Sequence, residues 1–184
     1  MDQVIKAADL KAAGVPGYLI DLKCRPGGPW QRILPGVVLL SASPPTRAQR
    51  LQAALAYAGP KAVVTGVDAL HAHGLHTLPP PARIHLLQPA TNRRSCAEHV
   101  LLERTTRPPK VVVEAGLPLA EPTRATLDAA RHEPDPLRQH HLLSTAVRSG
   151  LCTLTSLTRE LNAGSKRGTA TPRATLKLLS ALLR

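Results

Sequence analysis

The sequence contains very few aromatic residues. It has no phenylalanine, and aromatic residues make up 2% of its 184 positions. Only Tyr18, Trp30 and Tyr57 remain. Modules that bind single-stranded nucleic acid stack the bases on aromatic side chains. The scarcity therefore argues against an RNA-recognition domain or an OB fold.

Cysteines and long hydrophobic runs are also scarce. Cys24, Cys96 and Cys152 stand singly and are odd in number, which gives neither a disulfide framework nor a paired zinc knuckle. No uninterrupted apolar run approaches the thickness of a bilayer, and the first ten residues lack the pattern of a signal peptide. Since 43% of the residues are hydrophobic, the chain is too apolar to be disordered. We therefore expect a folded, cytoplasmic protein associated with the nucleoid.

Acidic residues are outnumbered two to one. Twelve Asp and Glu face 24 Lys and Arg, which gives a net charge of +12. Clustered bases gain free energy by releasing counterions from phosphates, so this balance favours a polyanionic partner. The bases are spread over the chain, and only the stretch 166–184 is purely basic. Together with the few aromatics, this favours duplex DNA, while a merely solvated, arginine-rich surface stays the alternative.

The first 43 residues carry the pattern of a winged helix-turn-helix. Two helices separated by Val15-Pro16-Gly17 are followed by two β-prone runs around Pro35-Gly36, which is the element order of that fold. We predict that residues 1–43 form this domain. The expected helices span 4–14 and 18–25, and the expected hairpin strands span 30–34 and 37–40.

The remaining residues, 44–184, predict a second domain in which helices pack on a small sheet. Thr46 is a typical N-cap, and Pro122 opens a part of the chain that we expect to be entirely helical. The fold class expected for the whole chain is therefore α+β. The expected elements are a helix over 46–58, a strand over 62–65, a helix over 67–74, strands over 83–87, 100–103 and 111–114, a short run over 116–119, and helices over 122–132, 135–150, from Thr153, and from Thr171-Pro172.

Motifs for catalysis or metal binding are weak. His71, His73 and His76 lack the spacing of a zinc site, and the adjacent pair His140-His141 would diverge on a helix. No phosphate-binding loop or cluster of acids is present, and the spacing of the cysteines neither shows nor excludes a histidine base. We predict that the protein is not an enzyme and has no catalytic residue, metal ligand or cofactor. A hydrolase that uses the histidines of 71–76 is the least favoured alternative.

Candidate DNA contacts lie in three regions of the sequence. The second predicted helix would face base edges, the hairpin would meet the backbone or minor groove, and two loop pairs would contact phosphates without sequence preference. The alternative for any single one of them is a solvated surface position. The candidates are Tyr18, Asp21, Lys23 and Arg25 on the helix, Gln31 and Arg32 at the hairpin, and Arg93, Arg94, Lys166 and Arg167 in the loops.

The chain resembles the AbiEi-like antitoxins of type IV abortive-infection toxin-antitoxin systems. Ala13-Gly14-Val15, the helix to Arg25, and the run from Gly28 to Val37 are similar to the winged helix of that family. The resemblance extends over about residues 4–173. Its further segments are 45–50, 54–55, 57–60, 62–66, 69–75, 103–105 and 122–130.

This resemblance implies a winged-helix repressor that binds promoter repeats of its own operon. The implied partners are duplex DNA and a nucleotidyltransferase-like toxin that the antitoxin need not bind directly. Apart from the resemblance, a second copy of the chain is a candidate partner. We expect the family's first helix to be missing before Val4, and we expect no nuclease-like C-terminal domain.

Two other functions stay open. One is a standalone regulator without a toxin. The other is a protein-interaction module in which residues 135–184 bind a partner and DNA binding is nonspecific. The leucine stripes at 154, 157 and 161 and at 176, 179 and 183 motivate this second alternative.

Overall fold

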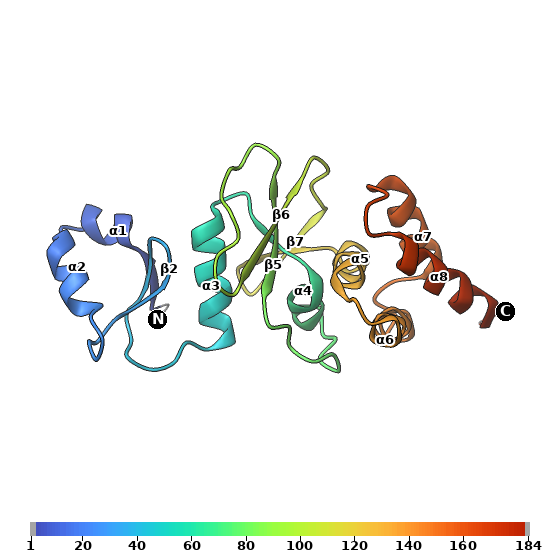
Figure 1. Ribbon diagram of the computed structural model, residues 1–184, viewed down its shortest axis with the longest axis horizontal. Helices are drawn as coiled ribbons and strands as arrows, with labels where there is room; N and C mark the ends of the chain where they lie inside the picture. Colours follow the sequence, from blue (N-terminus) through green and yellow to red (C-terminus); the bar gives the residue numbers. More distant parts are fainter. Residues whose placement is uncertain (1–2, 183–184) are drawn as a thin grey trace.

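The computed structural model describes residues 3–182 and has the predicted α+β class (Figure 1). Its strands form two sheets, a three-stranded sheet of order β1-β3-β2 and a five-stranded sheet of order β6-β5-β4-β8-β7. None of the helices in the described range is long and apolar enough to cross a membrane. The strands are β1 (Val4–Lys6), β2 (Gln31–Leu34), β3 (Val37–Leu39), β4 (Val63–Val64), β5 (Ile84–Pro89), β6 (Val100–Thr105), β7 (Val111–Glu114) and β8 (Leu117–Ala120). The helices are α1 (Ala7–Ala12), α2 (Gly17–Lys23), α3 (Arg47–Ala58), α4 (Gly66–Ala72), α5 (Pro122–His132), α6 (Pro136–Arg148), α7 (Leu154–Ala163) and α8 (Ala170–Leu182).

The prediction of a helix over 4–14 is wrong for its first three residues. Val4 and Ile5 pair in antiparallel register with Leu39 and Val38, so they extend the hairpin into a third strand. Both side chains are β-branched and fit a pleated strand better than a helix. The long-range strand pairing therefore overrides the local helical spacing, and α1 starts only at Ala7.

The hairpin and the second helix are confirmed. Strands β2 and β3 pair around Pro35-Gly36, and the turn is held close to α1 because the Gly36 carbonyl accepts the Ala7 N–H at 2.9 Å. Helix α1 ends one residue before Ala13, and Gly14 follows with φ of +89°, a value that glycine adopts without strain. The tight α1–α2 connection is thus built from the residues that predicted it.

The three-stranded sheet is shared by two hydrophobic cores. Successive residues of a strand face opposite sides. Val38 accordingly packs with Leu10 of α1 and Ile20 of α2, whereas Val37 and Leu39 join the main core against α3. In Figure 1 this sheet stands between α1 and α2 on one side and α3 on the other. The main core thus crosses the predicted boundary between residues 43 and 44.

Helix α3 links the two sheets. It starts at a capping box in which the Thr46 hydroxyl accepts the Gln49 N–H while the Gln49 side chain accepts the Thr46 N–H. Arg47 in its first turn donates to both oxygens of buried Asp68 on α4, at 2.8 and 2.6 Å. This bidentate pair fixes the start of α3 against the second half of the fold.

The five-stranded sheet is mixed. Strand β4 is parallel to β8 and antiparallel to β5, and β5 is parallel to the edge strand β6. Figure 1 shows α3 on one face of this sheet and α4 and α5 on the other. His132 of α5 contacts Glu103 of β6, which also contacts His85 of β5. The odd-numbered side chains of these two strands therefore face α5.

The C-terminal helices α5–α8 are confirmed. Asp135 caps α6 by accepting the Leu137 and Arg138 N–H groups, and Thr153 caps α7. Most of the leucine stripes lies inside the protein, because Leu157, Leu161, Leu176 and Leu179 are buried. Leu183 lies outside the described residues.

Replacement of Ile20 by alanine should destabilise the protein strongly, because Ile20 is 1% exposed between the small sheet and α1. We expect a loss of about 2–5 kcal/mol in the free energy of unfolding, measured by urea denaturation. The matched control is Leu22→Ala on the same helix, where the side chain is 47% exposed. Equal losses for the two variants would contradict the packing described here.

Candidate nucleic-acid interface and the buried ion pairs beside it

The outer face of α2 carries most of its predicted contact residues. Tyr18 is 74% exposed, and Arg25 lies exposed just after the helix. Ile20 on the opposite side is buried, so the packing fixes which face of the helix looks outward. The face therefore offers a phenol, an apolar patch at Leu22 and a guanidinium to any molecule that approaches it.

Two of the predicted bases near α2 already have partners. The Arg32 guanidinium on β2 forms an ion pair with the Asp21 carboxylate on α2, and both side chains are largely exposed. The Lys23 ammonium lies 4.9 Å from the centroid of the Trp30 ring, a cation–π distance. The structure thus brings the helix residues and the hairpin residues together as one surface. Within it, the Arg32 guanidinium is occupied by its ion pair with the Asp21 carboxylate.

Gln31 has a positioning role. Its amide Nε2 donates to the carbonyls of Ser41 and Ser43, both at 2.7 Å. Those bonds hold the segment that leaves β3 toward α3. Gln31 therefore shapes the hairpin, and its donor group is already used.

A second basic surface lies beside the edge strand β6. It is a hollow of about 750 Å³. Four arginines reach it from four separate segments of the chain. We call it the basic hollow and define it by Arg94, Arg104, Arg131, Arg167, Glu103 and His132.

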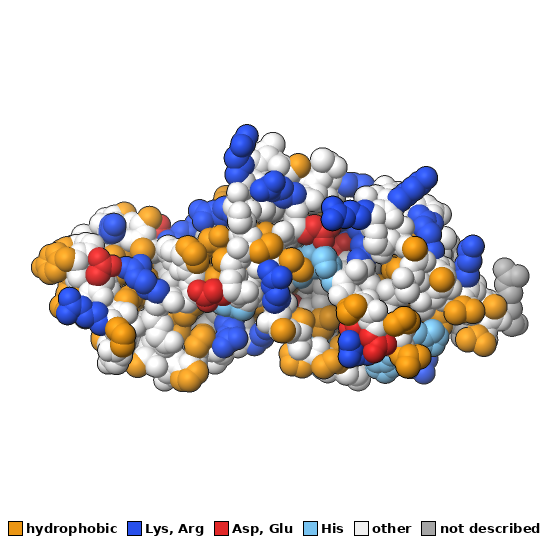
Figure 2. Space-filling view, in the orientation of Figure 1, with side chains coloured by type: hydrophobic (Ala, Val, Ile, Leu, Met, Phe, Trp, Pro, Cys, Tyr) orange, Lys and Arg blue, Asp and Glu red, His pale blue; other side chains and the backbone are white. Residues whose placement is uncertain are grey.

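The basic hollow unites the two predicted loop pairs. Arg94 and Arg167 line it although they are far apart in sequence, while Arg93 and Lys166 are exposed beside them. Arg94 also lies over the Tyr57 ring, 5.2 Å from its centroid. Figure 2 shows Lys and Arg side chains distributed along the whole visible face, as the even spread of charge in the sequence predicted.

Sequence reasoning missed Arg104 and Arg131. Arg104 is exposed and comes from β6. Arg131, on the last turn of α5, reaches the hollow from the other side. The position of Arg104 directly after the apolar run Val100–Leu102 and Glu103 was a usable signal, whereas no local pattern placed Arg131 next to it.

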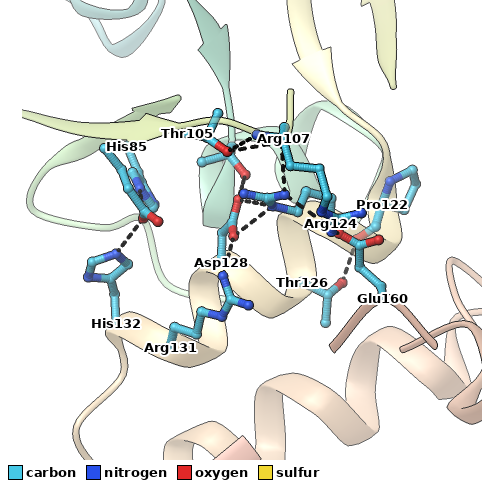
Figure 3. Close-up of polar contacts among 12 residues, drawn as sticks. His85, Thr105, Arg107, Pro122, Arg124, Thr126, Asp128, Arg131, His132 and Glu160 are labelled. Carbon is cyan, nitrogen blue, oxygen red and sulfur yellow. Dashed lines mark hydrogen bonds and ion pairs between the residues drawn. The ribbon is translucent and has the colours of Figure 1, made fainter. Parts of the chain in front are cut away.

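Beneath the hollow, Asp128 is the centre of a buried polar network (Figure 3). Its carboxylate is fully buried, and its two oxygens share the single N–H of Arg124 Nε, at 2.9 and 3.0 Å. The Thr65 hydroxyl at the end of β4 donates to it at 2.8 Å, and an Arg131 nitrogen lies 3.6 Å away. These contacts compensate for the cost of burying the charge.

The network continues into α7. Arg124 lies 3.6 Å from Glu160, which also pairs with Arg107 from the β6–β7 connection. Figure 3 shows Arg107, Arg124 and Glu160 gathered where α5 meets α7. Helices α5 and α7 and the sheet are thus held together by ion pairs and hydrogen bonds as well as by hydrophobic packing of leucine side chains.

A cluster of two histidines and one carboxylate lies next to this network. His85 Nε2 on β5 and His132 Nε2 at the end of α5 each lie 3.1 Å from the same oxygen of Glu103 on β6. Hydrogen bonds from His132, the larger effect, and from His85 hold the pKa of the Glu103 carboxyl far below its usual range, although burial alone would raise this pKa. No sequence motif connects these residues, because they come together only through the sheet and α5.

The histidines considered from the sequence do not form such a cluster. His71 donates to the Leu78 carbonyl at 2.8 Å, and His73 contacts Glu114 and the Ala120 carbonyl, both at 2.9 Å. The His71 ring thus bonds to a residue seven positions away, whereas the His73 ring connects the end of α4 to β7 and β8. Among the described residues, one group has the geometry of three metal ligands, and it contains neither of these histidines.

The three cysteines are unpaired and lie apart. Cys24 packs against the small core beside Ile20, which agrees with its predicted role as a small hydrophobic residue. Cys152 is buried, and burial raises the pKa of its thiol. Cys96 lines the basic hollow, where its sulfur accepts the Leu102 N–H at 3.3 Å.

Replacement of Asp128 by alanine should leave Arg124 buried without its carboxylate. We expect a loss of about 3–5 kcal/mol in the free energy of unfolding, measured by chemical denaturation. A second change, Arg124→Leu, should recover part of that loss. The control Asp9→Ala removes an exposed carboxylate and should change stability by less than about 0.5 kcal/mol. A loss below 1 kcal/mol for Asp128→Ala would contradict this role.

Comparison with known proteins gives a likeness of fold. No protein-family model and no curated protein sequence matches the chain. The structure is similar to the crystal structure of the RV2827C protein from Mycobacterium tuberculosis, with a TM-score of 0.61 and 16% sequence identity. The match covers 95% of this chain and 71% of the other. At this identity, the likeness concerns the fold alone.

Proposed function

We propose that the protein is a winged-helix regulator that binds duplex DNA and represses its own operon, as the resemblance to AbiEi-like antitoxins implies. The observation that carries the proposal is the outward face of α2, which stands beside the β2–β3 hairpin on a strongly basic chain. In this proposal α1 and α2 form the helix-turn-helix, and α2 enters the major groove. The protein acts in the cytoplasm by binding, without catalysis.

The residues near α2 divide into two roles. Tyr18 and Leu22 are exposed on the helix and are suited to contact base edges and thymine methyl groups. Lys23, Arg25 and Arg32 contact phosphates and set the register of the helix on the duplex. Trp30 anchors the hairpin to the small core, because it packs beside Ile20.

The basic hollow supplies a second, sequence-independent contact. Arg94, Arg104 and Arg167 are exposed along its rim and come from three different segments. Such a surface attracts the phosphate backbone without reading bases. In this proposal it binds a part of the duplex beyond the segment read by α2.

The competing interaction-module function has lost part of its support. Its leucine stripes are largely buried between α5, α6, α7 and α8, as most such stripes are. A nucleotidyltransferase-like toxin remains a proposed partner on the family resemblance alone, and a second copy of the chain remains a candidate partner apart from it. Whether the neighbouring gene encodes such a toxin separates a true antitoxin from a standalone regulator.

The central experiment is a salt titration of binding to the protein's own promoter and to unrelated duplexes. Affinity should fall steeply as salt rises, and the promoter should bind more tightly than unrelated DNA. Absence of binding to every duplex at low salt would overturn the proposal.

In the same titration, Asp21→Asn should tighten binding about two- to fivefold. The change releases Arg32 from an exposed ion pair worth up to about 1 kcal/mol and removes a negative charge that faces the phosphates. The control Glu133→Gln makes the same charge change at the α5–α6 connection and should have less effect. Weaker binding by Asp21→Asn would show that the carboxylate itself contacts the DNA.

The hollow is tested by the double variant Arg104→Ala/Arg167→Ala. If each arginine contacts one phosphate, the slope of log affinity against log salt should become shallower by about 1.8, with equal effects on all sequences. The control Arg159→Ala/Lys177→Ala removes two exposed bases from α7 and α8 and should leave the slope unchanged. An unchanged slope in the first variant would restrict the interface to α2 and the hairpin.

A further inference from the structure

The cluster formed by His85, Glu103 and His132 has the composition of a transition-metal site. Two imidazoles and one carboxylate are a ligand set that zinc uses when a fourth position stays open. Their ligand atoms all lie within 4.8 Å of one another. The three residues come from β5, β6 and the last turn of α5, so secondary structure on both sides holds them in place.

The distances fit an ion between the ligands. Each Nε2 lies 3.1 Å from the Glu103 oxygen, a few tenths of an ångström less than the edge, about 3.3–3.6 Å, of a tetrahedron with metal–ligand bonds of about 2.0–2.2 Å. The two imidazole rings stand nearly perpendicular, with centroids 4.6 Å apart. The rings are therefore not stacked, and both Nε2 atoms approach the same Glu103 oxygen, so small shifts would let all three groups contact one ion.

Burial and access also fit. The His85 side chain is 8% exposed and is held in the sheet, whereas the His132 side chain is 45% exposed. Glu103 and His132 line the basic hollow, so an ion could enter from solvent and would keep an open position toward the hollow. Because arginines surround that opening, an anionic group is the favoured fourth ligand.

The geometry points to a binding site for one divalent transition-metal ion, of the zinc class, held by His85, Glu103 and His132. Imidazole ligands favour zinc, copper, nickel or cobalt over magnesium or calcium. The ion would fasten the end of α5 to β5 and β6. This inference is independent of DNA binding, and it revises the expectation that the chain carries no metal ligand.

The test uses the full-length protein, stripped of metal by chelation and studied at neutral pH in a phosphate-free buffer. Zinc chloride is titrated into it by calorimetry, and cobalt is titrated separately while visible absorption is recorded. We expect one equivalent of zinc per chain, the intense visible bands of four-coordinate cobalt, and a rise in melting temperature with zinc.

Three variants decide between this site and adventitious binding. His132→Ala and Glu103→Gln should each weaken zinc binding at least about tenfold and abolish the cobalt bands. Because His132 is half exposed, its removal should leave the circular dichroism spectrum unchanged. The control His141→Ala removes the exposed member of the adjacent pair His140-His141, where surface zinc would otherwise bind, and should leave both signals intact.

Either of two results would overturn the inference. One is the absence of stoichiometric zinc uptake by the wild-type protein, which would leave the cluster as a pair of hydrogen bonds to Glu103. The other is an equal loss of binding in His141→Ala and His132→Ala, which would assign the metal to surface histidines.

Discussion

The buried carboxylate of Asp128 is the contact on which the second half of the fold depends. It receives hydrogen bonds from Thr65 at the end of β4 and from Arg124 on its own helix. Through Arg124 and Glu160 it is connected to α7. An arrangement that separated this carboxylate from Thr65 and Arg124 would leave a buried charge uncompensated, which costs several kcal/mol. The carboxylate therefore fixes how α5 lies on the sheet, and with it the positions of Arg131 and His132.

Local patterns in the sequence predicted most of the secondary structure. Thr46 was expected as a helix cap, and Asp135 and Thr153 as the first residues of two helices; the structure makes all three N-caps. The failure at Val4–Lys6 has a physical cause, because those residues pair with β3, more than thirty positions away. A helical spacing within eleven residues contains no information about such a partner.

The candidate sites also differ in whether a local sequence pattern or a long-range contact brings their residues together. Tyr18 and Arg25 could be identified from the sequence, since helical periodicity alone separates them from Ile20. The presence of Arg94 and Arg167 in one hollow, and the cluster of His85, Glu103 and His132, could not be identified from the sequence. The cluster depends on the parallel pairing of β5 with β6 and on the path of α5, which only the folded chain defines.

In the proposed mode of DNA binding, the sharing of the small sheet by two cores limits how a duplex can contact the protein. Val38 belongs to the core under α2, and its neighbours Val37 and Leu39 belong to the core around α3. The helix face and the basic hollow are therefore separated by packed side chains instead of a flexible linker. Twelve residues of α3, about 18 Å long, are part of that separation. In the proposed function, a duplex that contacts both surfaces has to match a fixed spacing, so any bend that this spacing requires costs less energy in easily deformed sequences than in stiff ones.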